Sequence, residues 1–165
     1  MRWYSLEPAD ADFLTSAPHL FRYRKRFAAR PERVWESLTS DASLAAWGPL
    51  VTDLKWLSPR PFGIGTEREV ALAPGLSRVR ERFFRWDEGR RYSFAAYQAN
   101  SPLLRRFAED YVVETDGGDG TLFSWTVGLE PKGPLSLPFR ALNPVLKTAF
   151  GRMATDGQRY FAKRG

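Results

Sequence analysis

The stretch ARPERVWESLTSDASLAAWGP, residues 29–49, has the pattern of two short consecutive helices, each of which carries a tryptophan. Pro31 suits the first position of the first helix, and Asp41 is predicted to cap the second. Helices this short are marginal in water, so they must pack on other elements. We expect Trp35 and Trp47 to close one end of an internal cavity.

Strands are predicted on both sides of this stretch, because apolar residues there recur with a period of two. The predicted strands are residues 20–28, 51–57, 66–72, 77–86, 91–98, 107–115 and 121–129. Glycine- and proline-rich turns separate most of them. Strands joined by short turns form an antiparallel meander.

The tail of the chain returns to a helical period, which predicts an amphipathic helix over residues 144–162 with Asn143 as its cap and Pro144 at its first position. Its apolar face needs a sheet to cover it. The sequence therefore predicts an α+β, helix-grip fold. A seven-stranded curved antiparallel sheet wraps around this helix, and two short helices lie between strands one and two. We expect a single domain, with residues 1–19 as a lead-in segment.

The composition narrows the class of protein. The chain has 165 residues, of which 43% are hydrophobic and 15% aromatic, and it has no cysteine. Disulfides, thiolate metal sites and a cysteine nucleophile are therefore excluded. With His19 as the only histidine, the serines cannot form an ordinary catalytic triad. No segment has the pattern of a signal peptide or a membrane span, so we expect a soluble cytoplasmic protein without a metal or cofactor.

The formal net charge of +6 raises nucleic acid and anionic membranes as partners. The arginines that alternate with apolar or aromatic residues along two strands predict solvated outer faces, and they are Arg22, Arg24, Arg26, Arg78, Arg80 and Arg82. No recognition-helix or zinc-finger pattern accompanies them. We expect no specific nucleic-acid binding, and weak contact with an anionic membrane stays open as an alternative. The sequence does not indicate an oligomeric state.

Two carboxylates interrupt apolar rows that should face the core. Glu81 lies between apolar residues of the strand 77–86, and Glu109 shares a row with Tyr111. If APGL, residues 73–76, is a four-residue turn, Arg68 lies opposite Glu81 on the same face. The pair is either a buried ion pair that fixes the register or a polar anchor in an apolar pocket.

Two glycine-rich segments bear on the site. In DGGDG, residues 116–120, we predict a bulge that places Trp125 on the same face as Tyr111. In GIGTER, Gly63 and Gly65 precede a strand pattern and not a helix, so this segment is predicted to be a turn and not a phosphate loop.

Five segments together resemble a known superfamily. They are APHLFRYRKRFAARPERVWESLTSDASLAAWGP, LKWLSPRPFGIGTEREV, VRERFFRWDEGRRYSF, FAEDYVVE and GTLFSWTV. In this order they resemble the START-related, birch-pollen-allergen-like superfamily, also called SRPBCC or polyketide cyclase/dehydrase, over residues 18–163. The resemblance implies the helix-grip fold but no single function, because this fold hosts carriers, receptors, cyclases and ring-hydroxylase subunits. The hydroxylase type needs two histidine ligands, which this chain lacks.

The predicted function is binding of an apolar or amphipathic small molecule, of lipid, polyketide or aromatic type, between the sheet and the last helix. The candidate ligand-binding residues are Trp47, Arg68, Glu81, Phe83, Phe94, Glu109, Tyr111, Trp125, Phe150 and Met153. One alternative is a polyketide cyclase or dehydratase that uses Glu81, Glu109 or Tyr111 for proton transfer. Another is a lipid or quinone carrier that docks on anionic membrane. No catalytic residue is assigned.

Overall fold

The computed structural model describes residues 1–73 and 77–164. Within them, seven antiparallel strands follow the sheet order β2-β8-β7-β6-β5-β4-β3, which confirms the predicted meander and its fold class. The strands are β2 (His19–Phe27), β3 (Val51–Trp56), β4 (Glu67–Leu72), β5 (Ser77–Asp87), β6 (Arg91–Ala99), β7 (Leu104–Thr115) and β8 (Thr121–Pro131). The lead-in adds a two-residue strand, β1 (Tyr4–Ser5), which pairs with β6.

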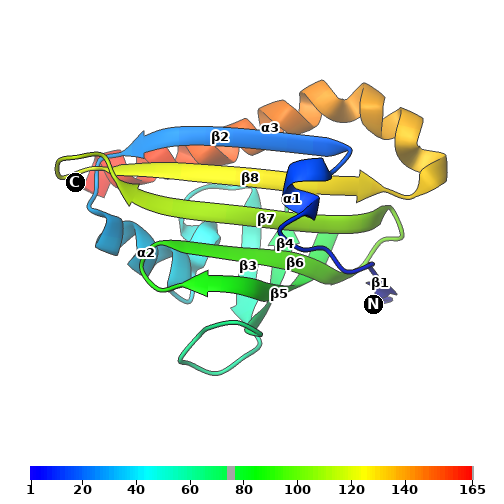
Figure 1. Cartoon of the computed structure of the whole chain (residues 1–165), viewed down its shortest axis with the longest axis horizontal. Helices are drawn as coiled ribbons and strands as arrows, with labels where there is room; N and C mark the ends of the chain where they lie inside the picture. Colours follow the sequence, from blue (N-terminus) through cyan, green and yellow to red (C-terminus); the bar gives the residue numbers. More distant parts are fainter. Residues whose placement is uncertain (74–76, 165) are drawn as a thin grey trace.

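The long helix α3 (Ser136–Arg164) lies along the inner face of the curved sheet, mainly over β2 (Figure 1). It begins earlier than predicted, directly after the 3-10 turn η2 (Gly133–Leu135), so Pro144 lies inside the helix. Pro144 has no N–H to donate to the carbonyl of Arg140. The helix bends along its first half in Figure 1, as is common near an internal proline. Asn143 does not cap the helix; its Oδ1 lies 3.1 Å from Nδ1 of His19.

The two short helices between the first strands of the meander are α2 (Pro31–Thr39) and the 3-10 helix η1 (Ser43–Ala46). Pro31 starts α2 as predicted. The prediction for Asp41 is wrong, because Ala42 precedes η1 and makes no side-chain cap. Asp41 instead pairs with Arg60, whose Nη2 lies 2.9 Å from its carboxylate.

One end of the space between sheet and α3 is filled by aromatic rings, and we call it the closed end. The rings of Phe27 and Phe123 stack with centroids 4.8 Å apart, and Trp47 meets Phe161 at 5.6 Å. Helix α3 approaches Trp47 closely because residue 157 is glycine: a Cβ there would lie 2.6 Å from Cε3 of the tryptophan. The closed end is therefore a packed core.

The outer face of the sheet is partly covered, which the sequence did not indicate. Helix α1 (Phe13–Ser16) lies over β7 and β8 on the face opposite α3 (Figure 1). Phe13 and Leu14 pack there with Ala108 in a second, smaller core. Residues on both faces of β7 are therefore buried.

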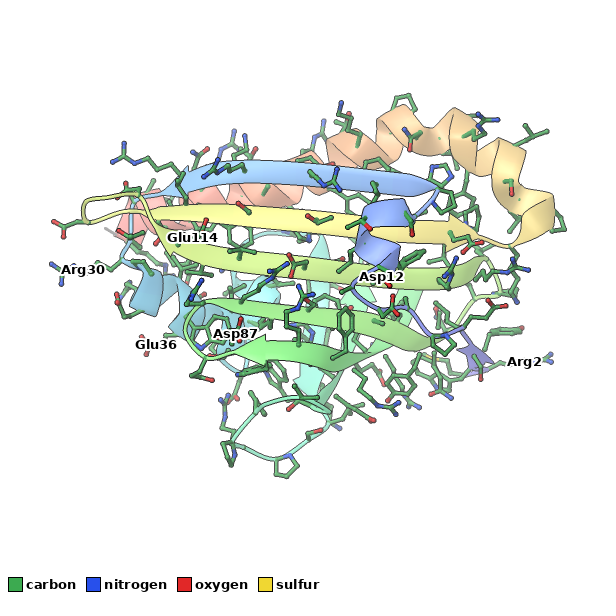
Figure 2. All side chains as sticks on the ribbon, viewed as in Figure 1. Arg2, Asp12, Arg30, Glu36, Asp87 and Glu114 are labelled. Atoms are coloured by element: carbon green, nitrogen blue, oxygen red, sulfur yellow. The ribbon has the colours of Figure 1, made fainter. Side chains whose placement is uncertain are left out.

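Elsewhere the outside of the molecule carries the charge. The charged side chains labelled in Figure 2, such as Asp12, Arg30 and Glu114, are exposed. The predicted solvated face of β5 is present as well: Arg80 lies 3.1 Å from Glu69, and Arg82 lies 2.7 Å from Glu67.

Candidate ligand-binding site

A cavity of about 180 Å³ lies between the sheet and α3, beside the closed end, and its wall is mostly apolar. Six strands, β3 to β8, together with η1 and α3 contribute to this wall. The wall includes eight of the ten residues predicted to bind a ligand, namely Arg68, Glu81, Phe94, Glu109, Tyr111, Trp125, Phe150 and Met153.

Two predicted residues do not lie on this wall. Trp47 belongs to the closed end, where Gly157 lets the helix cover it. Phe83 lies behind Arg68, with its ring centroid 5.0 Å from the guanidinium carbon. Trp35 does not line the cavity either; its Nε1 donates to Glu88 Oε1 at 2.9 Å. Neither tryptophan therefore lines the cavity: Trp47 lies at the closed end beside it, and Leu44 of η1 is on the wall.

The Arg68–Glu81 pair is present as predicted. Residue 68 of β4 pairs with residue 81 of β5, and Val70 pairs with Val79 in the same register. Residues 74–76 of the predicted turn lie outside the described residues. Nε of Arg68 donates to Oε2 of Glu81 at 2.6 Å, and the two side chains are 0% and 4% exposed. Such a pair fixes the register, because a slip by one residue would bury an unpaired charge.

Aromatic rings surround the guanidinium of Arg68. Its central carbon lies 4.5 Å from the ring centroid of Phe94 and 5.4 Å from that of Trp56. Burial acts to lower the pKa of Arg68, but the charge of Glu81 outweighs it, so the pKa lies above its ordinary value and the group stays cationic. Burial raises the pKa of Glu81, and contact with Arg68 opposes this rise.

Glu109 of β7 is the second buried carboxyl group on the wall. Its Oε2 accepts a hydrogen bond from Nε1 of Trp125 at 2.8 Å. The register of β7 and β8 makes this contact possible, because it pairs Tyr111 with Trp125 and puts both on one face, as predicted. No bulge is needed for it: the two strands pair regularly from Thr115 and Thr121 onward, and residues 116–120 form the loop between them. Gly117 in the connecting loop has a φ of 91°, which suits glycine. Burial, helped by the negative charge of Glu81, raises the pKa of Glu109 to about 8.

Two buried tyrosines complete the polar group. Tyr111 lines the cavity, and the ring of Tyr92 lies 5.0 Å from it. Burial raises the pKa of Tyr92 to about 12 and that of Tyr111 well above its ordinary value, so both hydroxyls stay protonated.

The sequence interpretation missed Tyr92 and also Phe139. The alternation in RRYSF places Tyr92 on the same face as Phe94, so a signal was present for it. Phe139 lines the cavity from the first turn of α3. It was missed because the helix was predicted to begin at residue 144.

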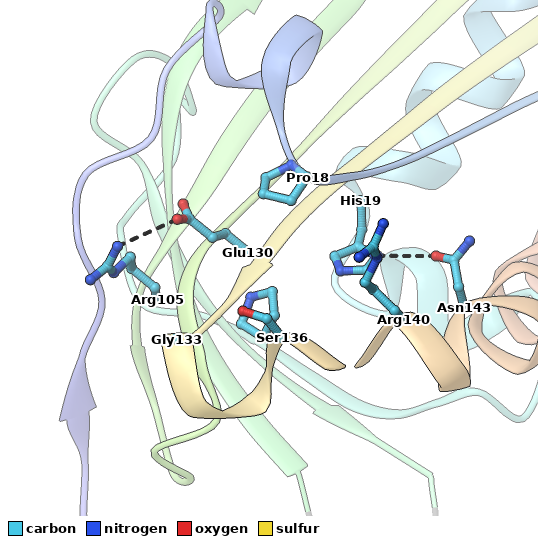
Figure 3. Close-up of a pocket in the computed structure, with 9 residues that line it drawn as sticks. Pro18, His19, Arg105, Glu130, Gly133, Ser136, Arg140 and Asn143 are labelled. Atoms are coloured by element: carbon cyan, nitrogen blue, oxygen red, sulfur yellow. Dashed lines mark hydrogen bonds and ion pairs between the residues drawn. The ribbon is translucent and has the colours of Figure 1, made fainter. Parts of the chain in front are cut away.

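A second hollow of about 510 Å³ lies at the start of α3. Its polar side chains bind one another, as Figure 3 shows: Arg105 lies 3.5 Å from Glu130, and His19 lies 3.1 Å from Asn143. Arg140 also lines it and is exposed. Because these groups face solvent or have partners, this hollow is a weaker candidate than the mostly apolar cavity between sheet and α3.

Residues 1–73 and 77–164 contain neither a metal-binding cluster nor a membrane-spanning helix. No three His, Asp or Glu side chains lie where they could hold one metal ion. None of the helices in those ranges has both the length and the hydropathy needed to cross a membrane.

The sheet, the helix that it grips and the cavity between them define a helix-grip protein of the SRPBCC superfamily. The chain belongs to the family described as "Polyketide cyclase / dehydrase and lipid transport", whose model matches residues 18–164. An uncharacterized protein of Mycobacterium tuberculosis is 31% identical over 157 residues, which cover 95% of this chain and 93% of the relative.

Solved structures support the same fold. A START superfamily protein from Mycobacterium smegmatis matches with a TM-score of 0.67 and 15% identity, over 88% of this chain and 96% of its own. TTHA0849 from Thermus thermophilus matches with a TM-score of 0.70 and 18% identity, over 88% and 99%. Ara h 8.0201 matches with a TM-score of 0.63 and 18% identity, over 87% and 98%. At these identities the likeness shows the fold alone.

Proposed function

We propose that the protein binds an apolar or amphipathic small molecule of lipid, polyketide or aromatic type in the cavity between sheet and α3. The observation that carries this proposal is a partly enclosed apolar cavity with a few buried polar groups, which is the usual composition of a small-molecule site. The eight predicted residues on its wall are the proposed contacts. We further propose that residues 1–165 act as one domain in the cytoplasm.

The size of the cavity limits the ligand. Its volume of about 180 Å³ is below the ~300–1,000 Å³ of most ligand pockets. The ligand is therefore compact, or the first half of α3 moves outward to admit a larger one. Phe150 is only partly buried, in keeping with looser packing on this side.

Mass spectrometry of small molecules extracted from gently purified protein tests this function. A variant that fills the cavity, Val79→Phe, is compared with Gly151→Ala, which changes α3 at a residue that does not line it. The expected result is a compound retained by the wild type and by Gly151→Ala but lost from the folded Val79→Phe variant. Equal retention by all three proteins, or no retained compound together with no thermal shift in a screen of apolar ligands, contradicts the proposal.

A specific observation favours a second function, that of a carrier that docks on anionic membrane. Leu137 and Val145 on the outer side of α3 are 74% and 63% exposed. Residues 131–155 contain four cationic residues, Arg140 and Lys147 among them, and no carboxylate. An apolar helix face with flanking cations suits the surface of an anionic bilayer. The opposite side of the same helix lines the cavity, so docking and ligand access would share one element.

Vesicle flotation tests this second function. Binding is expected to vesicles of phosphatidylcholine with phosphatidylglycerol, but not to phosphatidylcholine alone, and to weaken at high salt. The double change Leu137→Ser with Val145→Ser should abolish it. Ile64→Ser is the matched control, because Ile64 is 73% exposed in a distant loop. Equal loss in the control, or no binding by the wild type at low salt, excludes docking through α3.

A further inference from the structure

The sheet has a break between β6 and β7, and the lead-in segment fills it. The two strands pair with each other only as far as Ala95 of β6, which lies opposite Ala108. On the same side, the end of β6 pairs instead with β1, where Ser5 lies opposite Gln98. Figure 1 shows the N-terminus at this end of the sheet, where β7 begins. The sheet is therefore continuous here only because the lead-in is part of it.

Residues 4–7 lie in this break as a middle strand does. The N–H of Leu6 donates to the carbonyl oxygen of Tyr97 in β6 at 3.0 Å. The next N–H, that of Glu7, donates to the carbonyl oxygen of Arg105 in β7 at 2.9 Å. Because neighbouring strands lie about 4.8 Å apart, β6 and β7 are separated here by about 10 Å. Detachment of residues 4–7 would leave an opening wide enough for an aromatic ring or an aliphatic chain.

This opening would lead into the cavity, because residues on both sides of it line the cavity. They are Leu104 of β7 and Val79 of β5. Val79 pairs with Ala99 of β6, and Ala99 pairs in turn with Tyr4, so these three side chains share the inner face of the sheet. Alternation along the strand then places Leu6 on the inner face too. Leu6 packs accordingly against the main core and fills the break from inside.

Few interactions hold the lead-in in this position. The guanidinium carbon of Arg80 lies 4.0 Å from the ring centroid of Trp3, and Glu7 forms an ion pair with Arg105 at 3.5 Å. Glu7 is exposed, and Leu6 is only partly buried. Segments that bury little apolar surface open at a lower free energy than the whole fold does. Residues 4–7 are therefore expected to detach while the remainder of the sheet stays folded.

We propose that residues 3–7 form a strap that closes a lateral entrance to the cavity between β6 and β7, and that the ligand enters and leaves when this strap detaches. The inference rests on the proposed function and adds a route of access to it. Such a strap controls rates and not affinity. The ligand must pass the open state both to enter and to leave, whereas the strap is closed in the free protein and in the complex alike.

A disulfide that locks the strap onto β6 tests the inference. Ser5 lies opposite Gln98, and the pair that follows, Leu6 with Tyr97, is joined by a backbone hydrogen bond. In an antiparallel ladder the preceding pair is then non-hydrogen-bonded and has a short Cα distance, which suits a disulfide. The wild type contains no cysteine, so the variant Ser5→Cys with Gln98→Cys forms this disulfide alone. The same variant after reduction is the matched control.

Stopped-flow fluorescence with N-phenyl-1-naphthylamine, an uncharged apolar probe, measures the rates of association and dissociation. In the oxidised variant both rates are expected to fall by about tenfold or more relative to the reduced variant, because the strap can no longer open. The dissociation constant should change by less than about twofold, since the lock leaves the free and bound states as they were. A strap with a structural role alone would alter stability and leave both rates unchanged.

A loosened strap should give the opposite result. Leu6→Ala removes the apolar contact that holds the strap and should raise both rates several-fold, with little change in the dissociation constant. Leu20→Ala is the control for this variant, because Leu20 is also partly buried but packs against the second core beneath α1. It should leave both rates as they are in the wild type.

The outcomes separate the inference from the proposed function. Equal rates in the oxidised and reduced variants, with binding retained, would overturn the inference and leave the proposed function standing, and the ligand would then enter by movement of α3. Equal rates in Leu6→Ala and the wild type would overturn it as well, even if the disulfide does not form. If the probe binds none of these proteins, the proposed function fails for apolar aromatic ligands and the inference fails with it.

Discussion

The closed end and the cavity lie side by side between the same two layers, yet they are built differently. At the closed end, Gly157 lets α3 approach Trp47, and the rings of Phe27 and Phe161 stack at 5.2 Å. At the cavity, Phe139 and Phe150 of the same helix are only partly buried. The contrast shows how one helix can anchor a fold with its last turns and leave space for a ligand with its first.

The largest expected effect comes from the ion pair on the cavity wall. Glu81→Gln leaves Arg68 buried without a counter-ion, and breaking a buried pair costs about 3–5 kcal/mol of unfolding free energy. The double change Arg68→Met with Glu81→Leu should recover most of that loss, because no charge remains to be desolvated. Urea unfolding of the wild type, the single variants Arg68→Met and Glu81→Leu and the double variant measures this coupling, and Glu81→Gln is measured beside them.

Ligand binding by the double variant then separates the two roles that the sequence left open. Stability recovered without binding marks Arg68 as the ligand anchor. Recovery of both marks the pair as a register device alone. If the single changes alter neither stability nor binding, the pair has neither role.

Removing one aromatic ring from the closed end and one from the cavity wall should affect two different properties, which are stability and ligand binding. Trp47→Ala empties a site in which the ring is 5% exposed, and such changes cost about 3–5 kcal/mol. Phe150→Ala should cost less stability, because the ring is already partly exposed, but should weaken ligand binding. Denaturation paired with calorimetry measures both. Equal stability losses in the two variants, or weaker ligand binding in Trp47→Ala alone, would contradict the difference between the closed end and the cavity.

Glu109 on the cavity wall should also make the stability of the protein depend on pH. Glu109 has a pKa of about 8 in the folded protein and roughly 4.3 when unfolded. Between these values the folded state holds a proton that the unfolded state has lost. The unfolding free energy therefore falls as pH rises from about 5 to 8, by at most ~1.4 kcal/mol per pH unit. Denaturation at several pH values should show a shallower fall in Glu109→Gln; an unchanged slope would show that Glu109 is not the group responsible.

The smallest expected effects come from two glycines of α3. Gly157→Ala places a Cβ 2.6 Å from Trp47 and should cost about 1–3 kcal/mol through overpacking. Gly151→Ala is the control: its Cβ would lie 3.4 Å from the ring of Tyr23, an ordinary contact. Since alanine favours a helix over glycine by up to ~1 kcal/mol, Gly151→Ala should be neutral or stabilising. Thermal unfolding of both variants checks this difference in sign.

Much of the site was predictable because strands leave a simple pattern in sequence. The period of two along the strands predicted that Glu81 and Glu109 lie on apolar faces. A four-residue turn at residues 73–76 then predicted that Arg68 lies opposite Glu81. The face of Trp125, opposite Tyr111 on β7, followed from gathering the apolar side chains together, although a five-residue loop and not a bulge sets the register. These predictions depend on local geometry alone, which is why they could be made without knowledge of the packing.

The errors concern helix boundaries and helix packing. Pro144 was read as a helix start, but the chain tolerates it inside α3, because the exposed side of the helix leaves the freed carbonyl of Arg140 near solvent. The cover that α1 provides over Ala108 had no signal of its own, since four residues are too few to show a period.

The sequence by itself determined the order of elements, the antiparallel sheet and the charged pair on its inner face, since these depend on periodicity and on neighbouring strands. Only the tertiary structure decided where the space lies. Trp47 and Phe150 have the same apolar character in sequence, yet Trp47 fills the closed end and Phe150 borders the cavity. That difference depends on how closely α3 approaches the sheet along its length, and this distance is set by side chains that are far apart in the chain.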